Sequence, residues 1–328
     1  MASGKSRIST VISFLGPLLG LAFVMGVFIS NPEVRPYFLS GANFKIVFTQ
    51  TVIVAVCALG MTLIIVGGGI DLSLGSVVAL TSVVGATLLA KAVSPVWVVV
   101  LTIGAGALIG LLNGVTIAAF RLLPFIVTLG MMGVARGLAK WLAHDQTVIY
   151  PETPLNNLMK PDMRPEAPDA LFPLPPGVWI ALALALLMTV VMRRTVFGRY
   201  IFAIGANETA SRFSGIRVQR HKAIIYTVAG MFFGLGGLMQ MSRLTQGDPS
   251  VAIGLELDVI AAVVIGGASL NGGSGSIFGS MIGALMMAVL RNGSQQSGWP
   301  TYFQEIIIGI VIILAVGIDK LRHGRAKG

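Results

Sequence analysis

Residues 193–222 of this 328-residue chain read RRTVFGRYIFAIGANETASRFSGIRVQRHK, a basic polar segment between two long apolar runs. The segment contains seven Lys or Arg residues and a single acid, Glu208. An excess of Lys and Arg beside the ends of membrane spans keeps a loop on the cytoplasmic side. We therefore predict that 193–221 is a cytoplasmic loop of a membrane protein, and that the run from Gly205 to Gly215 forms a short helix exposed to a soluble partner.

The composition of the whole chain is typical of a membrane protein. Hydrophobic residues make up 55% of it, charged residues 11%, and the mean hydropathy is +0.86. Repeated apolar stretches of about 20 residues match the length that crosses a bilayer. The net charge of +10 is explained better by membrane orientation than by nucleic-acid binding, because the basic residues lie in short loops beside the spans. We expect no nucleic-acid partner.

Hydropathy predicts an all-α polytopic protein, with one transmembrane domain over residues 1–328 and about ten transmembrane helices. The predicted spans lie near residues 8–29, 45–66, 72–90, 95–118, 123–143, 177–192, 222–242, 256–270, 275–291 and 303–319. The first is interpreted as a retained span, because its apolar run is longer than a signal-peptide core and lacks a clear cleavage site. Ten is an even number, so both termini share a side, and the basic residues place that side in the cytoplasm.

The segment 145–176 is predicted to be an external loop. It contains five acids against two basic residues and is dense in proline. Such a loop can be a lid or a docking surface for an extracytoplasmic partner. A plain connection is the alternative, and proline-rich segments without periodicity are more often of that kind.

Glycine is the second strong signal, with 41 residues. Small residues four positions apart line one face of a helix and let backbones approach closely in lipid. Five pairs have this spacing: Gly16/Gly20, Gly106/Gly110, Gly133/Gly137, Gly230/Gly234 and Gly279/Gly283. Together they predict a bundle of closely packed helices, and tight packing without a transport role is the simpler interpretation of each.

Two glycine-rich segments interrupt the apolar runs in similar ways, IIVGGGIDLSLGS at 64–76 and VVIGGASLNGGSGS at 263–276. We predict broken helices near 67–75 and 266–276, because paired interruptions in two halves of a transporter mark its pathway. The alternative is a pair of tight cytoplasmic turns in which Asp71 is a helix N-cap.

Polar side chains within the spans are few, and a charge at the bilayer centre costs at least about 2.5–3.5 kcal/mol. Our candidates for a polar translocation pathway are Asp71, Ser73, Asn113, Arg136, Asp258 and Asn271. Structural pairing between helices is the competing interpretation, above all for Arg136 and Asp258.

Motifs for chemistry are missing from the sequence. It contains no GxxxxGK[ST] phosphate loop, no HExxH and no CxxC, and its three histidines are scattered in loops. We therefore expect a non-catalytic protein that binds no cofactor or metal itself and takes its energy from elsewhere.

Four long segments resemble the permease subunit of ribose-type ATP-binding-cassette importers, the family that takes up simple sugars. They are ALGMTLIIVGGGIDLSLGSVVALT (58–81), LLNGVTIAAFRLLPFIVTLGMMGVARGLA (111–139), FGRYIFAIGANETASRFSGIRV (197–218) and LELDVIAAVVIGGASLNGGSGSIFGSMIGALMMAVLRNG (255–293). They occur in the family's order, and the resemblance runs from about Gly41 to Leu321. The loop 145–176 looks longer and richer in proline than is usual in this family, so its docking surface is expected to differ.

The resemblance implies a type II importer permease of ten spans in a bacterial inner membrane. Its implied partners are a second copy or a sister permease, an extracytoplasmic sugar-binding protein, and two cytoplasmic ATPase subunits that use ATP and Mg²⁺. The substrate would be a ribose-like pentose or a related monosaccharide. The ATPase-coupling residues would be Gly205, Asn207, Glu208, Ser211, Arg212 and Gly215. An ion-coupled secondary transporter, using acids such as Asp71 or Asp258, is the alternative function.

Overall fold

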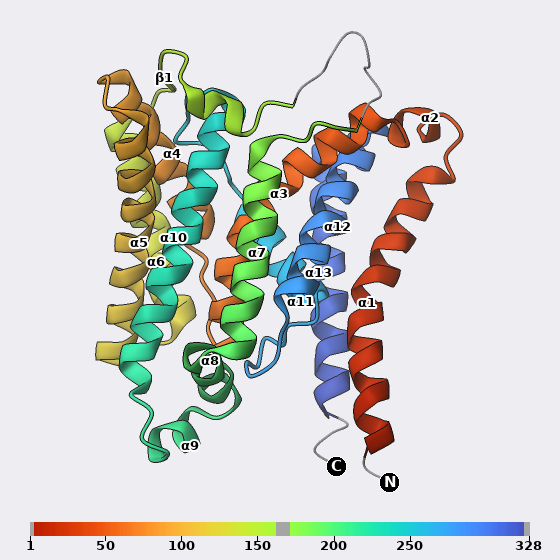
Figure 1. The fold of residues 1–328 in the computed structure, drawn as a ribbon, viewed down its shortest axis with the longest axis vertical. Helices are drawn as coiled ribbons and strands as arrows, with labels where there is room; N and C mark the ends of the chain where they lie inside the picture. The colour runs from red at the N-terminus through yellow and green to blue at the C-terminus, as the bar shows by residue number, and fades with distance from the viewer. Residues whose placement is uncertain (1–2, 162–170, 325–328) are drawn as a thin grey trace.

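The computed structural model of the chain describes residues 3–161 and 171–324, which form thirteen α-helices, one 3-10 helix and a two-stranded sheet. Most of the long helices run between two ends of one bundle (Figure 1). One end carries α8 (Val196–Ala206) and α9 (Glu208–Phe213), together with the start of α1 (Ser3–Ile29) and the end of α13 (Thr301–Gly324). The opposite end carries the strand β1 (Val148–Ile149). We call them the α9 end and the β1 end.

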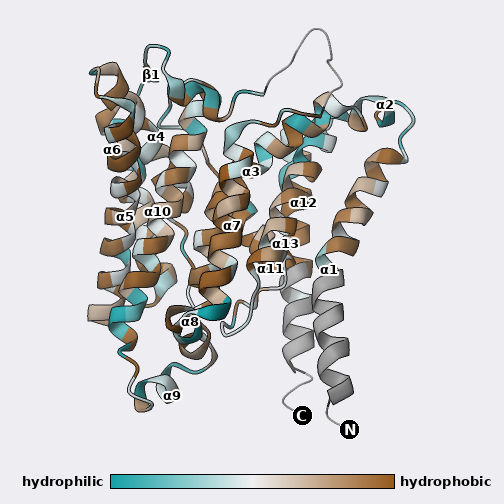
Figure 2. Cartoon of the chain, viewed as in Figure 1, coloured by the Kyte–Doolittle hydropathy of each residue, from teal (hydrophilic) through white to brown (hydrophobic). Residues whose placement is uncertain are grey.

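Within the described residues, six helices are long and apolar enough to cross a membrane. They are α3 (Gly41–Val66), α5 (Pro95–Phe120), α6 (Pro124–Leu142), α7 (Pro176–Arg194), α10 (Val218–Leu244) and α12 (Ile277–Gln296). Hydrophobic residues dominate the visible faces of helices such as α5 and α7 (Figure 2). Each of the six overlaps a predicted span, so the all-α polytopic class is confirmed.

The other four predicted spans overlap α1, α4 (Leu74–Ala90), α11 (Leu255–Ile265) and α13, and the count of ten crossing helices is not confirmed. The helix α11 has 11 residues. At a rise of 1.5 Å per residue it is about 16 Å long, roughly half of a hydrocarbon core. The helix is thus shorter than the predicted span 256–270, because it ends where Gly266 and Gly267 begin the second glycine-rich segment.

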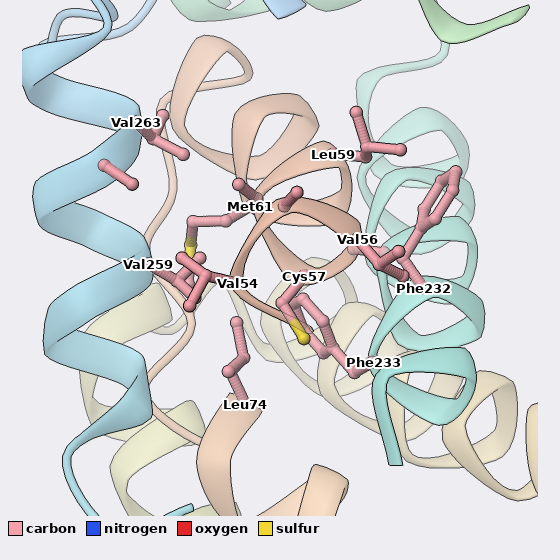
Figure 3. Close-up of a cluster of buried hydrophobic side chains, with 14 of the residues drawn as sticks. Val54, Val56, Cys57, Leu59, Met61, Leu74, Phe232, Phe233, Val259 and Val263 are labelled. Carbon is pink, nitrogen blue, oxygen red and sulfur yellow. The ribbon is translucent and has the colours of Figure 1, made fainter. Parts of the chain in front are cut away.

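The helix α3 forms the centre of the bundle. Every residue from Thr51 to Val66 is buried, as expected for a helix that is hydrophobic all round. Figure 3 shows its side chains in one buried cluster with residues of three other helices, Val259 of α11, Phe233 of α10 and Leu74 of α4. The first residue of α4, Leu74, is therefore fully buried in the same cluster, inside the bundle.

Close glycine contacts join α5 to α10. A Cβ on Gly106 would overlap the backbone of Gly230 and would lie 2.7 Å from the Cα of Gly234. A Cβ on Gly110 would overlap the carbonyl oxygen of Tyr226. These two predicted glycine pairs are thus confirmed as a packing face, where small residues let two long apolar helices touch along their backbones.

The remaining glycine pairs divide into two groups. Gly279 and Gly283 bring α12 against Gly266 and Ala262 in the same close way. By contrast, a Cβ on Gly16, Gly133 or Gly137 would meet no described atom within 4 Å, and Gly20 has only the end of the Met286 side chain near it. The spacing alone therefore does not tell a packed glycine from an open one.

The described part of the predicted loop 145–176 is anchored to α10. Its strand β1 (Val148–Ile149) pairs antiparallel with β2 (Gln246–Gly247), and its 3-10 helix η1 (Pro154–Leu158) lies against the end of α10. The Ser242 hydroxyl of α10 donates to the carbonyl oxygen of Leu155 (2.7 Å) and accepts from the amide of Met159 (3.1 Å). This part of the loop is therefore ordered by hydrogen bonds to α10 and β2 and is more than a plain connection. Residues 162–170 lie outside the described part of the chain.

Candidate functional site

The basic segment 193–221 folds into two helices at the α9 end, α8 (Val196–Ala206) and α9 (Glu208–Phe213). The Asn207 side chain caps α9 by accepting from the amide of Ala210 at 2.9 Å. Gly215 follows the helix with φ at +84°, a left-handed conformation that favours glycine. The short helix predicted between Gly205 and Gly215 is therefore confirmed. Ser211, on the inner side of α9, is buried.

Glu208 binds two cations, Arg212 of α9 itself and Lys222, which ties α9 to α10. Its carboxylate accepts from Arg212 at 3.0 Å and from Lys222 at 2.6 Å. Partial burial raises the pKa of the Glu208 carboxyl, but the hydrogen bond from Lys222 and the charges of Lys222 and Arg212 outweigh it and lower the pKa. The carboxylate therefore stays ionised near neutral pH, and the contact is lost only as the pH falls through this lowered pKa.

Phe213 is the residue of α9 that sequence reasoning missed. Its side chain is 88% exposed. Exposed aromatic side chains in a polar setting are typical anchors of protein interfaces. The signal was available in the sequence, because Phe213 is a large apolar residue between Arg212 and Ser214 in an otherwise polar run.

Both predicted helix breaks meet the end of α8 in one backbone contact, which we call the glycine junction (Gly68, Gly205, Gly272 and Gly273). A Cβ on Gly205 would overlap the carbonyl oxygen of Val66, the last residue of α3. The amide of Gly273 donates to that same carbonyl at 2.8 Å. Segments 67–73 and 266–276 and the α8–α9 connection are therefore packed together as one unit.

Three of the predicted pathway residues, Asp71, Ser73 and Asn113, form one buried cluster. Asp71 accepts from the amide (2.8 Å) and the hydroxyl (2.6 Å) of Ser73, and the Asn113 amide donates to Ser73 at 3.0 Å and to Asp71 at 3.3 Å. Asn113 lies seven residues before the end of α5, which is about 10 Å along the helix axis. Asp71 thus lies inside the bundle. The N-cap interpretation is wrong, since Ser73 occupies that position of α4.

Two further residues, which sequence reasoning missed, form hydrogen bonds to the backbone of the segment 67–73. The Thr128 hydroxyl of α6 accepts from the amide of Leu72 at 3.2 Å, and the Tyr226 hydroxyl of α10 donates to the carbonyl oxygen of Ile70 at 3.3 Å. Non-helical backbone inside a membrane bundle requires such partners. The cluster around Asp71 therefore stabilises the break after α3.

Arg136 holds a different non-helical segment, the one that leads into α11. Its guanidinium donates to the carbonyl oxygens of Pro249 (2.6 Å) and Val251 (2.8 Å). A Cβ on Gly75, at the start of α4, would overlap both Ala252 and the carboxylate of Glu256. The first turns of α4 and α11 therefore meet inside the bundle.

Asp258 is paired and borders a cavity. Its carboxylate forms an ion pair with Arg291 of α12 at 2.5 Å, and only 4% of its side chain is exposed. The pair borders a cavity of about 240 Å³, which we call the Asp258 cavity. Other polar residues that line it are Gln50, Gln240, Arg243 and Gln295. The predicted structural pairing of Asp258 is confirmed, with a partner on another helix.

A larger cavity, of about 620 Å³, lies at the β1 end. It is lined by the anchored loop and the facing ends of α3 and α10, including Thr49, Asn156, Asn157 and Lys160. Gln50 and Arg243 line both this β1-end cavity and the Asp258 cavity. The two cavities therefore adjoin along a wall of amide and guanidinium groups, whereas Asn271 is exposed in the segment between α11 and α12 and lines neither.

Residues 43–316 match the family described as "Branched-chain amino acid transport system / permease component". The ribose import permease protein RbsC of Escherichia coli strain K12 is 38% identical over 298 residues, 88% of each chain. That of Bacillus subtilis strain 168 is 38% identical over 314 residues, 94% of each chain. The galactose/methyl galactoside import permease protein MglC of Salmonella typhimurium is 36% identical over 304 residues, 89% of this chain and 90% of the relative. No solved structure matches significantly. The chain therefore belongs to this family of transport permeases, in the branch that includes the sugar import permeases.

Proposed function

We propose that this protein is the membrane-spanning permease subunit of an ATP-driven importer that moves a ribose-like pentose or a related monosaccharide across a bacterial inner membrane. The family description names branched-chain amino acids, but relatives that cover about nine tenths of the chain are ribose and galactose permeases. The cavities support a sugar over an apolar amino acid, because amide and guanidinium groups match hydroxyl groups. The chain has no phosphate loop, so a separate ATPase hydrolyses ATP with Mg²⁺.

In this proposal the β1 end is external and the α9 end, with both termini, is cytoplasmic. The helices α1, α4, α11 and α13 then complete ten membrane helices, of which α4 and α11 begin inside the bundle. A sugar-binding protein docks at the β1 end beside the anchored loop. The second permease of the pair, an identical copy or a sister chain, covers the face on which the charged Arg291 is 38% exposed, because a guanidinium facing lipid is costly.

The sugar path runs from the β1-end cavity into the Asp258 cavity. Gln50 and Arg243 are its boundary, since both line the two cavities. This is the observation that carries the proposed path. The Asp71 cluster and Arg136 serve it indirectly, by holding the two non-helical segments from which α4 and α11 begin.

The coupling element is α9, with Phe213 as its anchor on the ATPase. Closure of the ATPase pair moves α9, the Glu208–Lys222 contact carries the movement to α10, and the glycine junction carries it to both helix breaks. A partner shifts a conformational equilibrium only when it binds one state better than the other. The ATPase must therefore prefer one position of α9.

The function is tested by reconstitution in vesicles with the ATPase and the binding protein. Uptake of radiolabelled ribose or galactose should require both partners and ATP, and should not respond to an ion gradient. Uptake by the permease alone under a proton or sodium gradient would contradict the proposal and would favour the ion-coupled alternative.

The variant Phe213→Ala removes the exposed aromatic side chain of α9. It should lower the affinity of the permease for the ATPase by about thirtyfold or more, because truncating an interface anchor costs about 2 kcal/mol or more. The measurement is ATPase affinity for the purified permease in detergent. The matched control is Phe172→Ala, which removes another exposed aromatic (61%) from outside α9. Equal affinity of the two variants would exclude Phe213 as the anchor.

Replacing the amide shared by the cavities, Gln50→Leu, should lower the rate of sugar uptake about three- to tenfold, because one lost hydrogen bond is worth about 0.5–1.5 kcal/mol. ATPase affinity should stay unchanged. Gln146→Leu serves as the control, since Gln146 is exposed and lines neither cavity. A normal uptake rate in Gln50→Leu would place the sugar path elsewhere.

A further inference from the structure

A third polar cavity, of about 300 Å³, lies at the α9 end, between the turn from α5 to α6, the helix α9 and the first turns of α10. Its walls carry three cations, Arg121, Arg212 and Lys222, and one carboxylate, Glu208. Three positive charges against one negative leave two in excess. The sugar path does not reach this cavity, which shares no lining residue with either of the cavities described above.

One of the two excess charges lies on Arg121, and the other is shared by Arg212 and Lys222 around Glu208. Glu208 is already bound by both Arg212 and Lys222. Within the described residues, no carboxylate pairs with Arg121, which caps the end of α5 in a left-handed conformation with φ at +53°. The cavity therefore presents an available guanidinium beside a carboxylate that its own neighbours have neutralised.

Apolar side chains line the same cavity. Leu122 and Leu123 contribute to its wall and are 45% and 67% exposed, and the adjacent Phe120 is 72% exposed. They lie in the turn between α5 and α6, two candidate membrane spans. In the most apolar stretch of each helix, only 28% (α5) and 17% (α6) of the residues are buried. A cationic group beside exposed apolar residues at the end of two spans is typical of the headgroup level of a bilayer.

We propose that this cavity binds an anionic phospholipid of the cytoplasmic leaflet. Its phosphate is held by Arg121, with Lys222 and Arg212 nearby, and its acyl chains lie over Leu122 and Leu123. Guanidinium groups favour phosphate because they donate two parallel hydrogen bonds. The bound lipid would bridge the α5–α6 turn to α9 and so steady the coupling helix against the bundle.

The test measures lipid retained by the purified permease without ATPase or binding protein, by native mass spectrometry and thermal unfolding. Phosphatidylglycerol should be retained and should raise the unfolding temperature, while phosphatidylethanolamine should do neither. Arg121→Gln should retain at least fivefold less phosphatidylglycerol, and Arg121→Lys should recover part of the loss. Arg199→Gln is the control, since it removes an exposed positive charge of α8 that does not line the cavity.

Two results would overturn the proposal. One is equal retention by Arg121→Gln and Arg199→Gln, which would mean a general attraction of basic residues. The other is an equal, Arg121-dependent stabilisation by inorganic phosphate without lipid, which would assign the site to a soluble anion. Because binding is measured on the permease alone, failure here leaves the proposed sugar transport untouched.

Discussion

Gly205→Ala should reduce ATP-driven sugar uptake at least tenfold while the permease still folds and inserts. A methyl group at this position would overlap the Val66 carbonyl oxygen and lie 2.6 Å from the Gly273 amide nitrogen. Both of those are backbone atoms, so the contact is not relieved by turning a side chain. Overpacking of this kind costs about 1–3 kcal/mol, and here it forces α8 away from both helix breaks.

The measurement separates coupling from folding. Uptake and ATP hydrolysis stimulated by the binding protein are compared in the same vesicles, and thermal unfolding of the purified variant is recorded. We expect ATP hydrolysis to continue with little sugar uptake. The ATPase still binds α9, but the glycine junction no longer transmits the movement of α9 to the helix breaks.

Gly133→Ala on α6 is the matched control for this substitution. A Cβ there meets no described atom within 4 Å, so uptake should remain normal. Normal uptake in Gly205→Ala as well would show that the glycine junction is not part of the coupling route.

Local patterns in the sequence predicted the elements of this site well. The polar run around Glu208 gave α9, because an apolar chain that turns basic and polar for some thirty residues leaves the membrane. The clusters at Gly67–Gly69 and Gly266–Gly267 predicted the two helix breaks, because glycine is a poor helix former. Each of these signals depends on neighbours along the chain.

What could not be predicted is how these elements meet. Nothing in the sequence links Gly205 to Val66, or Asp258 to Arg291, because such contacts depend on how the helices pack. Likewise, the hydropathy pattern predicts a single span over residues 256–270. It does not show that α11 begins beside the start of α4 or that α11 ends at Ile265. Gln240 and Arg243 were missed as cavity residues for the same reason. Which face of α10 borders a cavity depends on the helices that pack around α10, and the sequence does not show that packing.

The ion pair between Asp258 and Arg291 should make the largest contribution to stability of any single polar contact considered. Arg291→Met leaves a buried carboxylate without its cation, which costs about 3–5 kcal/mol. We expect a clear fall in the unfolding temperature of the detergent-solubilised permease. The exposed pair Lys140–Asp145, at 3.4 Å and with side chains 48% and 68% exposed, is the control: Lys140→Met should cost less than about 1 kcal/mol.

A double variant distinguishes the structural role of this pair from a role in transport. Asp258→Asn removes the carboxylate that Arg291→Met leaves unpaired, so the combined variant should recover most of the lost stability, as buried pairs often do when both charges are removed. If the pair only holds α11 to α12, uptake should recover with stability. The Asp258 cavity leads us to expect otherwise: the double variant should fold well yet transport sugar several-fold more slowly, because the charged wall beside Gln50 and Arg243 has been lost.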